Sequence, residues 1–244
     1  MGKVYLVGAG PGDPELITLK GLKILQKSDV VIYDRLVNEK ILEYAVNAKE
    51  FICVGKEVGE SWKQEEINKL LVEKARKYDN VVRLKNGDPM LFGRGGEECE
   101  VLKEAGISYE IIPGISSALA GPTYAGIPVT HREYSSSIAI VTGHRKEGCV
   151  DELDYLKKIF SSVDTTIILM GVSNLEKIVK IASSSLPPTT PIAIVENATL
   201  REQRVLTGDL QNIVEISQRY QVKPPAVIIL GEVVTLREKL RWLE

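Results

Sequence analysis

Cysteine and histidine are scarce in this chain, which has three cysteines and two histidines among its 244 residues. Cys53, Cys99 and Cys149 are odd in number, lie far apart and form no Cys-x-x-Cys motif. A disulfide framework is therefore not expected, and reduced, buried thiols are. Because His131 and His144 are the only histidines, a metal site of histidine and cysteine ligands has little support, and we expect no bound metal.

A basic excess and long apolar runs are also absent. The 31 basic and 33 acidic residues give a formal net charge of −2, whereas proteins that bind nucleic acids or membrane surfaces usually carry a basic excess. No apolar stretch approaches the ~20 residues of a membrane-spanning helix. The first apolar run is short and meets Gly8, which indicates a strand and not a signal peptide. We expect a cytoplasmic protein without nucleic-acid or membrane partners, in which an anionic ligand would need a local cluster of cations.

Hydrophobic residues make up 44% of the chain, which is enough for a packed core. In the first half, short β-branched runs that are apolar on both faces alternate with helical patterns. Such runs are typical of buried parallel strands, so the alternation predicts an open, mostly parallel α/β sheet. The expected strands are residues 4–7, 30–33, 51–54, 81–84 and 109–112, and the expected helices are 64–78 and 97–105.

The second half alternates in the same way, but it predicts a mixed sheet. Between the strand-like residues 192–196 and 203–207 there is no room for a crossover helix, so these strands are expected to pair antiparallel. Residues 113–128 are rich in Gly, Ser, Ala and Pro and are the best candidate for the connection, which predicts two α/β domains, residues 1–113 and 114–244. The remaining expected strands are 137–142, 165–170 and 226–231, and the helices are 153–160, 175–183 and 210–220.

The glycines of residues 8–13, Gly-Ala-Gly-Pro-Gly-Asp, permit a tight turn and the close approach of a ligand to the backbone. A dinucleotide-binding loop reads Gly-x-Gly-x-x-Gly, with an acidic residue ~20 positions later. Asp34 meets the second requirement, but Asp13 and Pro14 stand where the last glycine and the helix belong. A nicotinamide site is therefore disfavoured, and a loop for another ligand or a plain structural turn are the alternatives.

Charged residues follow the expected strands, at the end where open α/β sheets bind ligands. Asp34 ends the second strand and Lys56 follows the third. An aspartate and a lysine at this edge are suited to exchanging protons or holding a polar substrate. The alternative is a surface salt bridge.

Residues 83–98 form the densest motif, in which charged residues and glycines surround the apolar triplet Met-Leu-Phe. Apolar walls with few polar groups suit a ligand cleft, whereas the alternative is a complex turn before a helix. Asp88 suits a ribose, Arg94 suits a carboxylate, and Glu97 suits either Arg94 or a ring N–H.

Small residues dominate the next motif, residues 113–132, where Ser116 and Ser117 allow close approach of a ligand or of another backbone. Arg132 ends this motif as a second fixed cation near the expected cleft, and a tightly packed hinge is the alternative. Methionine usually fills a core, so Met170 at a strand end is a weak signal by itself.

Three long blocks, residues 7–37, 82–98 and 113–134, resemble the signature blocks of uroporphyrinogen-III C-methyltransferases, within the larger tetrapyrrole methyltransferase fold family. The likeness covers the whole chain in order and includes the shorter motifs at 141–144, 169–171 and 195–197. Gly-Arg-Gly-Gly-Glu-Glu at 93–98 and Thr-His-Arg at 130–132 indicate the uroporphyrinogen enzymes over later corrin methyltransferases and diphthine synthase.

This resemblance implies two α/β domains with a ligand cleft between them, in which residues 1–113 form the substrate side and residues 114–244 share the S-adenosylmethionine site. It also implies a homodimer that methylates uroporphyrinogen III at C2 and C7 to precorrin-2, for cobalamin or sirohaem biosynthesis, and releases S-adenosylhomocysteine. The implied donor contacts are Pro11, Asn86, Gly87, Asp88, Leu91, Ser116, Ser117, Met170 and Ala198. The implied residues at the substrate are Asp34, Lys56, Arg94, Glu97 and Arg132. Asn86 replaces a usual glycine, which leaves the backbone shape of its loop open.

The competing functions make different demands on these residues. A related methyltransferase acting on a later corrin precursor or a diphthamide intermediate would share the fold, but residues 83–98 and 113–132 disfavour it. A nicotinamide oxidoreductase is opposed by Asp13, and a binding module leaves the charges at the strand ends unexplained. In the favoured reaction Asp34 or Glu97 is expected to accept a proton. Arg35, Lys56, Arg94 and Arg132 are expected to pair with substrate carboxylates.

Overall fold

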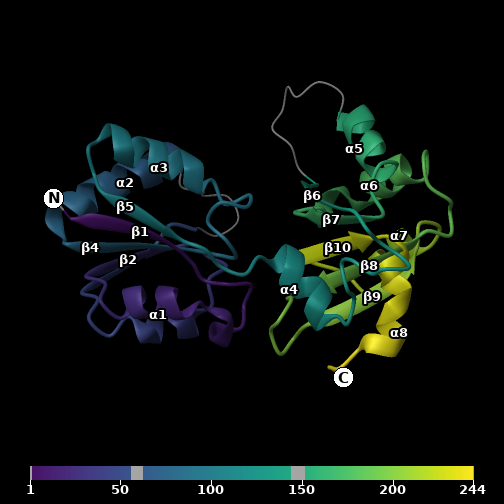
Figure 1. Cartoon of the computed structure of the whole chain (residues 1–244), viewed down its shortest axis with the longest axis horizontal. Coiled ribbons are helices and arrows are strands. Elements are labelled where there is room, and N and C mark those ends of the chain that lie inside the picture. The colour runs from purple at the N-terminus through teal and green to yellow at the C-terminus, as the bar shows by residue number, and fades with distance from the viewer. Residues whose placement is uncertain (1, 56–62, 144–151, 244) are drawn as a thin grey trace. The chain divides into compact units, whose positions relative to one another are not determined.

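The computed structural model describes residues 2–55, 63–143 and 152–243. It divides into two compact units, Met1–Ser116 and Ser117–Glu244, each of which is an α/β structure with its own five-stranded sheet (Figure 1). Lys56, His144 and Cys149 lie outside the described residues. In the described part of the chain, no helix has the length and apolar character needed to cross a membrane.

The sheet of the first unit is entirely parallel, as the doubly apolar strand patterns predict. Its strand order is β3-β2-β4-β1-β5, and Val4 of β1 lies between Val81 of β4 and Tyr109 of β5. The strands are β1 (Lys3–Gly8), β2 (Val30–Tyr33), β3 (Glu50–Cys53), β4 (Asn80–Lys85) and β5 (Tyr109–Ile112).

Helices cover both faces of this sheet (Figure 1). Helices α2 (Gln64–Lys77) and α3 (Gly95–Glu104) pack on the face that carries Leu6 and Val81. Helix α1 (Leu19–Leu25) and the 3₁₀ helix η2 (Glu39–Tyr44) cover the opposite face. Because successive residues of a strand point to opposite faces, strands such as β1, β2 and β4 supply residues to two separate apolar cores.

The chain leaves β1 and β4 in opposite directions, toward β2 and β5 respectively, although β1 and β4 are neighbours. In open α/β sheets, ligands bind at the carboxyl ends of strands where the order reverses in this way. The first unit therefore has its topological switch point between the loop that begins after Gly8 and the loop that begins after Lys85.

The sheet of the second unit is mixed, with the order β6-β7-β10-β8-β9. Strands β6 and β7 are parallel, and the pairs β7–β10, β10–β8 and β8–β9 are antiparallel, which confirms the antiparallel pairing expected for residues 192–207. The elements are β6 (Ile138–Thr142), α5 (Glu152–Phe160), β7 (Thr165–Leu169), α6 (Leu175–Ala182), β8 (Pro191–Glu196), β9 (Arg204–Asp209), α7 (Ile213–Arg219) and β10 (Ala226–Leu230). Leu156, Ile178 and Ile213 of α5, α6 and α7 share one core with Ile194 and Ile228.

Helix α4 (Ser117–Tyr124) contacts β10 and β7. Periodicity does not predict it, because its sequence, Ser-Ala-Leu-Ala-Gly-Pro-Thr-Tyr, has small residues in place of an apolar stripe. A β-carbon at Gly121 would lie 3.3 Å from Val227 Cγ2 of β10. The small residues of this segment thus let the helix pack closely against the side chains of β10.

The expectation of buried thiols is correct for Cys99 and wrong for Cys53, which is exposed. Strand β3 lies at the edge of the first sheet, and its residues alternate between partly buried and exposed positions. One face of β3, with Phe51 and Cys53, is therefore left exposed, and the apolar residue types of this strand did not guarantee burial.

Candidate functional site

The loops that leave β1, β4 and β5 meet at the switch point of the first unit. Gly10 and Gly87 exchange two backbone hydrogen bonds of 3.3 and 2.8 Å. A β-carbon at Gly8 would lie 2.5 Å from Gly114 Cα and 2.7 Å from the Gly87 carbonyl oxygen. The glycines are thus needed because three backbones touch here, and they bring Pro11, Gly87 and Ser116 into one region.

Replacing Gly8 by alanine is expected to destabilise the protein by about 1–3 kcal/mol, because the added methyl group collides with backbone that cannot rotate away. Gly96→Ala is the matched control, since its β-carbon would meet nothing within 4 Å and alanine is the better helix former. Urea denaturation monitored by circular dichroism measures both free energies of unfolding. Equal effects of the two substitutions would contradict the crowding at Gly8.

Asp88 closes the loop after β4 with both carboxylate oxygens. Oδ1 accepts the Met90 N–H at 2.8 Å and Oδ2 accepts the Gly114 N–H at 3.0 Å. A carboxylate has lone pairs for further donors, so this contact with the backbone is compatible with binding a hydroxyl group. Asn86 has no left-handed backbone, whereas Gly87 has φ +68°. The left-handed residue of this loop is therefore a glycine. Asn86, where a glycine is usual, needs no left-handed backbone.

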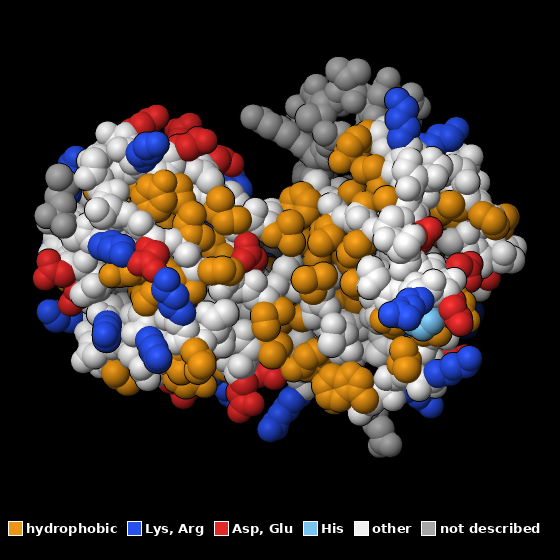
Figure 2. All heavy atoms as spheres, in the orientation of Figure 1, with side chains coloured by type: hydrophobic (Ala, Val, Ile, Leu, Met, Phe, Trp, Pro, Cys, Tyr) orange, Lys and Arg blue, Asp and Glu red, His pale blue; other side chains and the backbone are white. Residues whose placement is uncertain are grey.

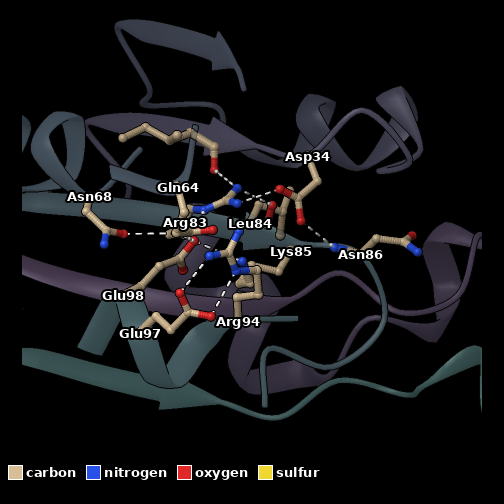
Figure 3. Close-up of polar contacts among 11 residues, drawn as sticks. Asp34, Gln64, Asn68, Arg83, Leu84, Lys85, Asn86, Arg94, Glu97 and Glu98 are labelled. Atoms are coloured by element: carbon tan, nitrogen blue, oxygen red, sulfur yellow. Dashed lines mark hydrogen bonds and ion pairs between the residues drawn. The ribbon is translucent and has the colours of Figure 1, made fainter. Parts of the chain in front are cut away.

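A buried charged cluster lies beside this loop (Figure 3). Arg83, Lys85 and Glu98 are exposed by only 1%, 3% and 0%. Glu98 Oε1 accepts from Arg83 Nε at 3.0 Å and from Lys85 Nζ at 2.9 Å. Arg83 also forms an ion pair with Asp34, which joins the predicted site residue to the cluster.

The charges of this cluster shift the pKa values of its two cations in opposite directions. Burial disfavours the charged form of Arg83, but Asp34 and Glu98 outweigh burial and raise the pKa of Arg83. Burial and then repulsion by Arg83 lower the pKa of Lys85, although Glu98 and Asp34 oppose this. Arg83 is therefore the fixed cation of the cluster.

The sequence motifs did not mark Arg83, Lys85 or Glu98 as site residues. A signal was present, because the residues expected to form a strand apolar on both faces include Arg83, with Lys85 next on the same face. Charged side chains are seldom fully buried unless they are paired. Two cations on a buried face therefore require acidic partners, and Glu98 of the following helix supplies one.

Arg94 and Glu97 form an exposed pair at the start of α3. Arg94 donates through Nε to Glu97 Oε1 at 2.9 Å and through Nη2 to Oε2 at 2.7 Å, and this contact with Glu97 raises the pKa of Arg94. Glu97 thus orients Arg94 by a bidentate contact, which was one of its two expected roles. The guanidinium keeps further N–H donors for an anionic ligand.

Exposed apolar side chains accompany these polar groups on the carboxyl-end loops of the first unit. Leu36, Met90, Phe92 and Ile115 are all exposed, and Figure 2 shows that hydrophobic side chains gather in groups on the face that it displays. Apolar walls with a few fixed polar groups are typical of sites for organic ligands. The loops of the first unit have this composition.

The second unit has a similar edge. Strands β6, β7 and β8 run in the same direction, so the loops after them share one edge of the sheet. Met170 follows β7 and is 54% exposed, with φ 54°, and Ala198 follows β8 between Asn197 and Thr199, with φ 47° and 73°. Ala198 also lies near α4, because a β-carbon at Gly121 would be 3.5 Å from its Cβ.

Backbone strain marks the loops of both units. Among the described residues, non-glycine residues with left-handed φ are Phe92, Arg94, Met170, Asn197, Thr199 and Gln221. All except Gln221 lie in loops that hold predicted site residues. Such conformations cost energy and cluster at functional sites, where the surrounding structure enforces them.

Arg132 is placed apart from the other predicted residues of the second unit. It lies in an exposed turn between His131 and Ser135, and the Ser135 hydroxyl accepts from Thr165 Oγ1 at 2.8 Å. Thr165 begins β7, so this turn is anchored at the amino edge of the sheet, whereas Met170 is at the carboxyl edge. In the described ranges, no group of three or more His, Cys, Asp or Glu side chains is arranged to hold a metal ion.

Comparison with known proteins identifies this architecture. Residues 3–214 match the model of the tetrapyrrole (corrin/porphyrin) methylases. A uroporphyrinogen-III C-methyltransferase of Methanocaldococcus jannaschii is 52% identical over 238 residues, which are 96% of this chain and 98% of the relative.

Two crystal structures have the same fold. One is a uroporphyrin-III C-methyl transferase of Thermus thermophilus complexed with S-adenosylhomocysteine, with 43% identity, a TM-score of 0.82 and coverage of 96% of this chain and 100% of that chain. The other, a cobalt precorrin-4 methyltransferase, has 27% identity, a TM-score of 0.83 and coverage of 95% of both chains. The chain described here belongs to the tetrapyrrole methylase family.

Proposed function

We propose that this protein is an S-adenosylmethionine-dependent methyltransferase that converts uroporphyrinogen III to precorrin-2 by methylation at C2 and C7. The observation that carries the proposal is the 52% identity, over almost the full length of both chains, to a uroporphyrinogen-III C-methyltransferase. The fold alone does not select the substrate, because a cobalt precorrin-4 methyltransferase gives an equally high TM-score at only 27% identity. Its product would feed cobalamin or sirohaem biosynthesis.

The residues at the carboxyl edges suit the methyl donor. When bound, S-adenosylmethionine supplies a methyl group on a sulfonium with a good leaving group. In the first unit, the touching glycine loops and the Asp88 carboxylate are suited to a nucleoside and its ribose hydroxyls. We assign Pro11, Asn86, Gly87, Asp88, Leu91 and Ser116 of the first unit and Ser117, Met170 and Ala198 of the second to donor binding. Residues 1–113 would then form the substrate side and residues 114–244 complete the donor site.

The protein's task in this reaction is mainly positioning. A porphyrinogen carbon is an enamine-like nucleophile, so no covalent enzyme intermediate is needed, and holding it in line at near-attack distance supplies much of the rate. Attack develops positive charge on the pyrrole nitrogen, and a proton must later leave the ring. Asp34 is suited to both tasks, because it is partly exposed and Arg83 holds it at the carboxyl edge of the sheet.

Apolar side chains match the macrocycle of the substrate, and cations match its carboxylates. Leu36, Met90 and Phe92 offer apolar surface to a macrocycle. Arg35, Lys56 and Arg94 are proposed partners of its eight carboxylates, which reconciles an anionic substrate with a net charge of −2. Arg94 is the strongest candidate among these cations, since Glu97 fixes its guanidinium. Arg132 is left out of this proposal, because its turn is anchored at the amino edge of the second sheet.

Arg94→Lys is expected to raise the KM for uroporphyrinogen III about tenfold without changing the KM for the donor, because lysine cannot bind a carboxylate through two parallel hydrogen bonds. Steady-state kinetics with each substrate varied measure this. Arg219→Lys is the control, because Arg219 is likewise exposed and paired with a glutamate of its own helix, Glu215. An unchanged KM in Arg94→Lys would place Arg94 outside the substrate site.

The decisive test is anaerobic incubation of the purified protein with methyl-labelled S-adenosylmethionine and uroporphyrinogen III. Two labelled methyl groups per macrocycle are expected, with the absorbance change of precorrin-2 formation. Binding of S-adenosylhomocysteine without transfer would support a methyltransferase with another substrate, such as a later corrin precursor. Absence of both transfer and binding would refute the proposal.

We also propose that the protein acts in the cytoplasm as a homodimer, as the family resemblance and the composition led us to expect. Size-exclusion chromatography with light scattering measures the oligomeric state. A mass of about 27 kDa, equal to one chain, would contradict the dimer.

A further inference from the structure

Glu98 lies at the centre of the buried cluster, although the proposed reaction has no direct use for a side chain without solvent exposure. Its Oε1 atom accepts from Arg83 Nε at 3.0 Å, from Lys85 Nζ at 2.9 Å and from Gln64 Nε2 at 3.3 Å. These donors come from β4 and α2, whereas Glu98 belongs to α3 (Figure 3). One carboxylate oxygen therefore connects three elements.

Arg83 extends this connection from Glu98 to the site edge. Its Nη1 donates to the carbonyl oxygens of Ile32 at 3.5 Å and Leu84 at 3.4 Å, and its Nη2 pairs with Asp34 Oδ1. The guanidinium is planar, so a carboxylate fixed at Nε also fixes the direction in which Nη2 points. The side chain of Asp34 is 33% exposed. Of the three linked residues Glu98, Arg83 and Asp34, it is the one that a substrate can reach.

Stability does not account for this arrangement. Removing charges from water is costly, and well-packed apolar residues often replace a buried ion pair without loss of stability. On the same face of β4, Val81 lies in an apolar core with Leu6 and Leu102. The charges begin only at Arg83, toward the carboxyl end, where Asp34 lies beside the strand.

We propose that Glu98 is a positioning residue for methyl transfer, which holds the Arg83 guanidinium and through it fixes the Asp34 carboxylate toward the reacting pyrrole. This inference rests on the proposed function. Glu98 touches no substrate, so it acts on the rate of the reaction and not on the affinity for the donor. Its effect passes through Asp34, and it should disappear when Asp34 can no longer act.

A double-mutant cycle of Glu98→Gln, Asp34→Asn and the double variant tests this coupling. Glu98→Gln alone is expected to lower kcat about tenfold, while the KM for S-adenosylmethionine and the dissociation constant of S-adenosylhomocysteine change less than about twofold. In the Asp34→Asn background, adding Glu98→Gln is expected to change kcat by less than about twofold. A merely structural role would lower kcat by the same factor in both backgrounds, and that result would overturn the inference.

Glu100→Gln is the matched control, because Glu100 is an exposed glutamate of the same helix, and its kcat is expected to equal that of the wild type. If Glu98→Gln does not fold by circular dichroism, the same cycle is made with Glu98→Asp, which keeps the charge but withdraws it from Arg83. Non-additive effects support the inference and additive effects refute it. An inactive wild type would refute the proposed function, whereas an active wild type with additive variants refutes the inference alone.

Discussion

Asp34→Asn is expected to lower kcat for methyl transfer to uroporphyrinogen III by about 10²–10⁴-fold, the range for loss of a general base. Asparagine keeps the shape of the side chain and can still accept a hydrogen bond from Arg83, but it neither takes a proton nor stabilises positive charge on the pyrrole nitrogen. The dissociation constant of S-adenosylhomocysteine, measured by calorimetry, is expected to stay the same.

Asp29→Asn is the matched control for this experiment. Asp29 precedes the same strand, β2, and its carboxylate accepts the Asn80 N–H at 2.9 Å, at the amino edge of the sheet. Its kcat is expected to equal that of the wild type. If Asp34→Asn loses donor binding instead of kcat, Asp34 belongs to the donor site and not to the proton-transfer step.

Arg83→Met is expected to lower the free energy of unfolding by about 3 kcal/mol, at the lower end of the range for a broken buried ion pair, because Lys85 still partly neutralises Glu98. Methionine fills much of the volume of arginine, so the loss reports mainly on the uncompensated carboxylate. Chemical denaturation followed by fluorescence and circular dichroism measures it.

Arg94→Met provides the comparison, because Arg94 pairs with Glu97 at the surface, where both side chains are more than half exposed. Exposed pairs contribute about 0–1 kcal/mol, since water screens the charges. If both variants lost equally little stability, leaving the Glu98 carboxylate without Arg83 would cost no more than breaking a surface pair.

Much of the fold was predictable because strands and helices leave periodic patterns. The five expected strands of the first unit are all present, and the antiparallel pairing of β8 and β9 followed from the short segment between them. Helix α4 was not predictable in this way, since Gly121 and Pro122 oppose helix formation. It is helical because small side chains let it pack against β10, and that is a tertiary effect.

The candidate site was predictable only where residues follow strands. Because all strands of the first sheet are parallel, Asp34 and Asp88 had to lie at one edge. The partners of these residues depend on side-chain directions across elements, so the Glu98–Arg83–Asp34 connection could not be read from spacing. The placement of Arg132 at the amino edge of the second sheet likewise depends on a contact with Thr165 through Ser135.

The strand order of the first sheet also has a consequence for folding during synthesis. The only neighbours of β1 are β4 and β5, and Val4 pairs with Val81 and Tyr109. An emerging chain that ends before Asn80 therefore has no partner for its first strand. Contacts of such long sequence separation form late and leave apolar strands exposed to aggregation. When β4 inserts between β1 and β2, it joins these strands into one sheet and brings Arg83 to Asp34 in the same event, and only β5 is then still to be added.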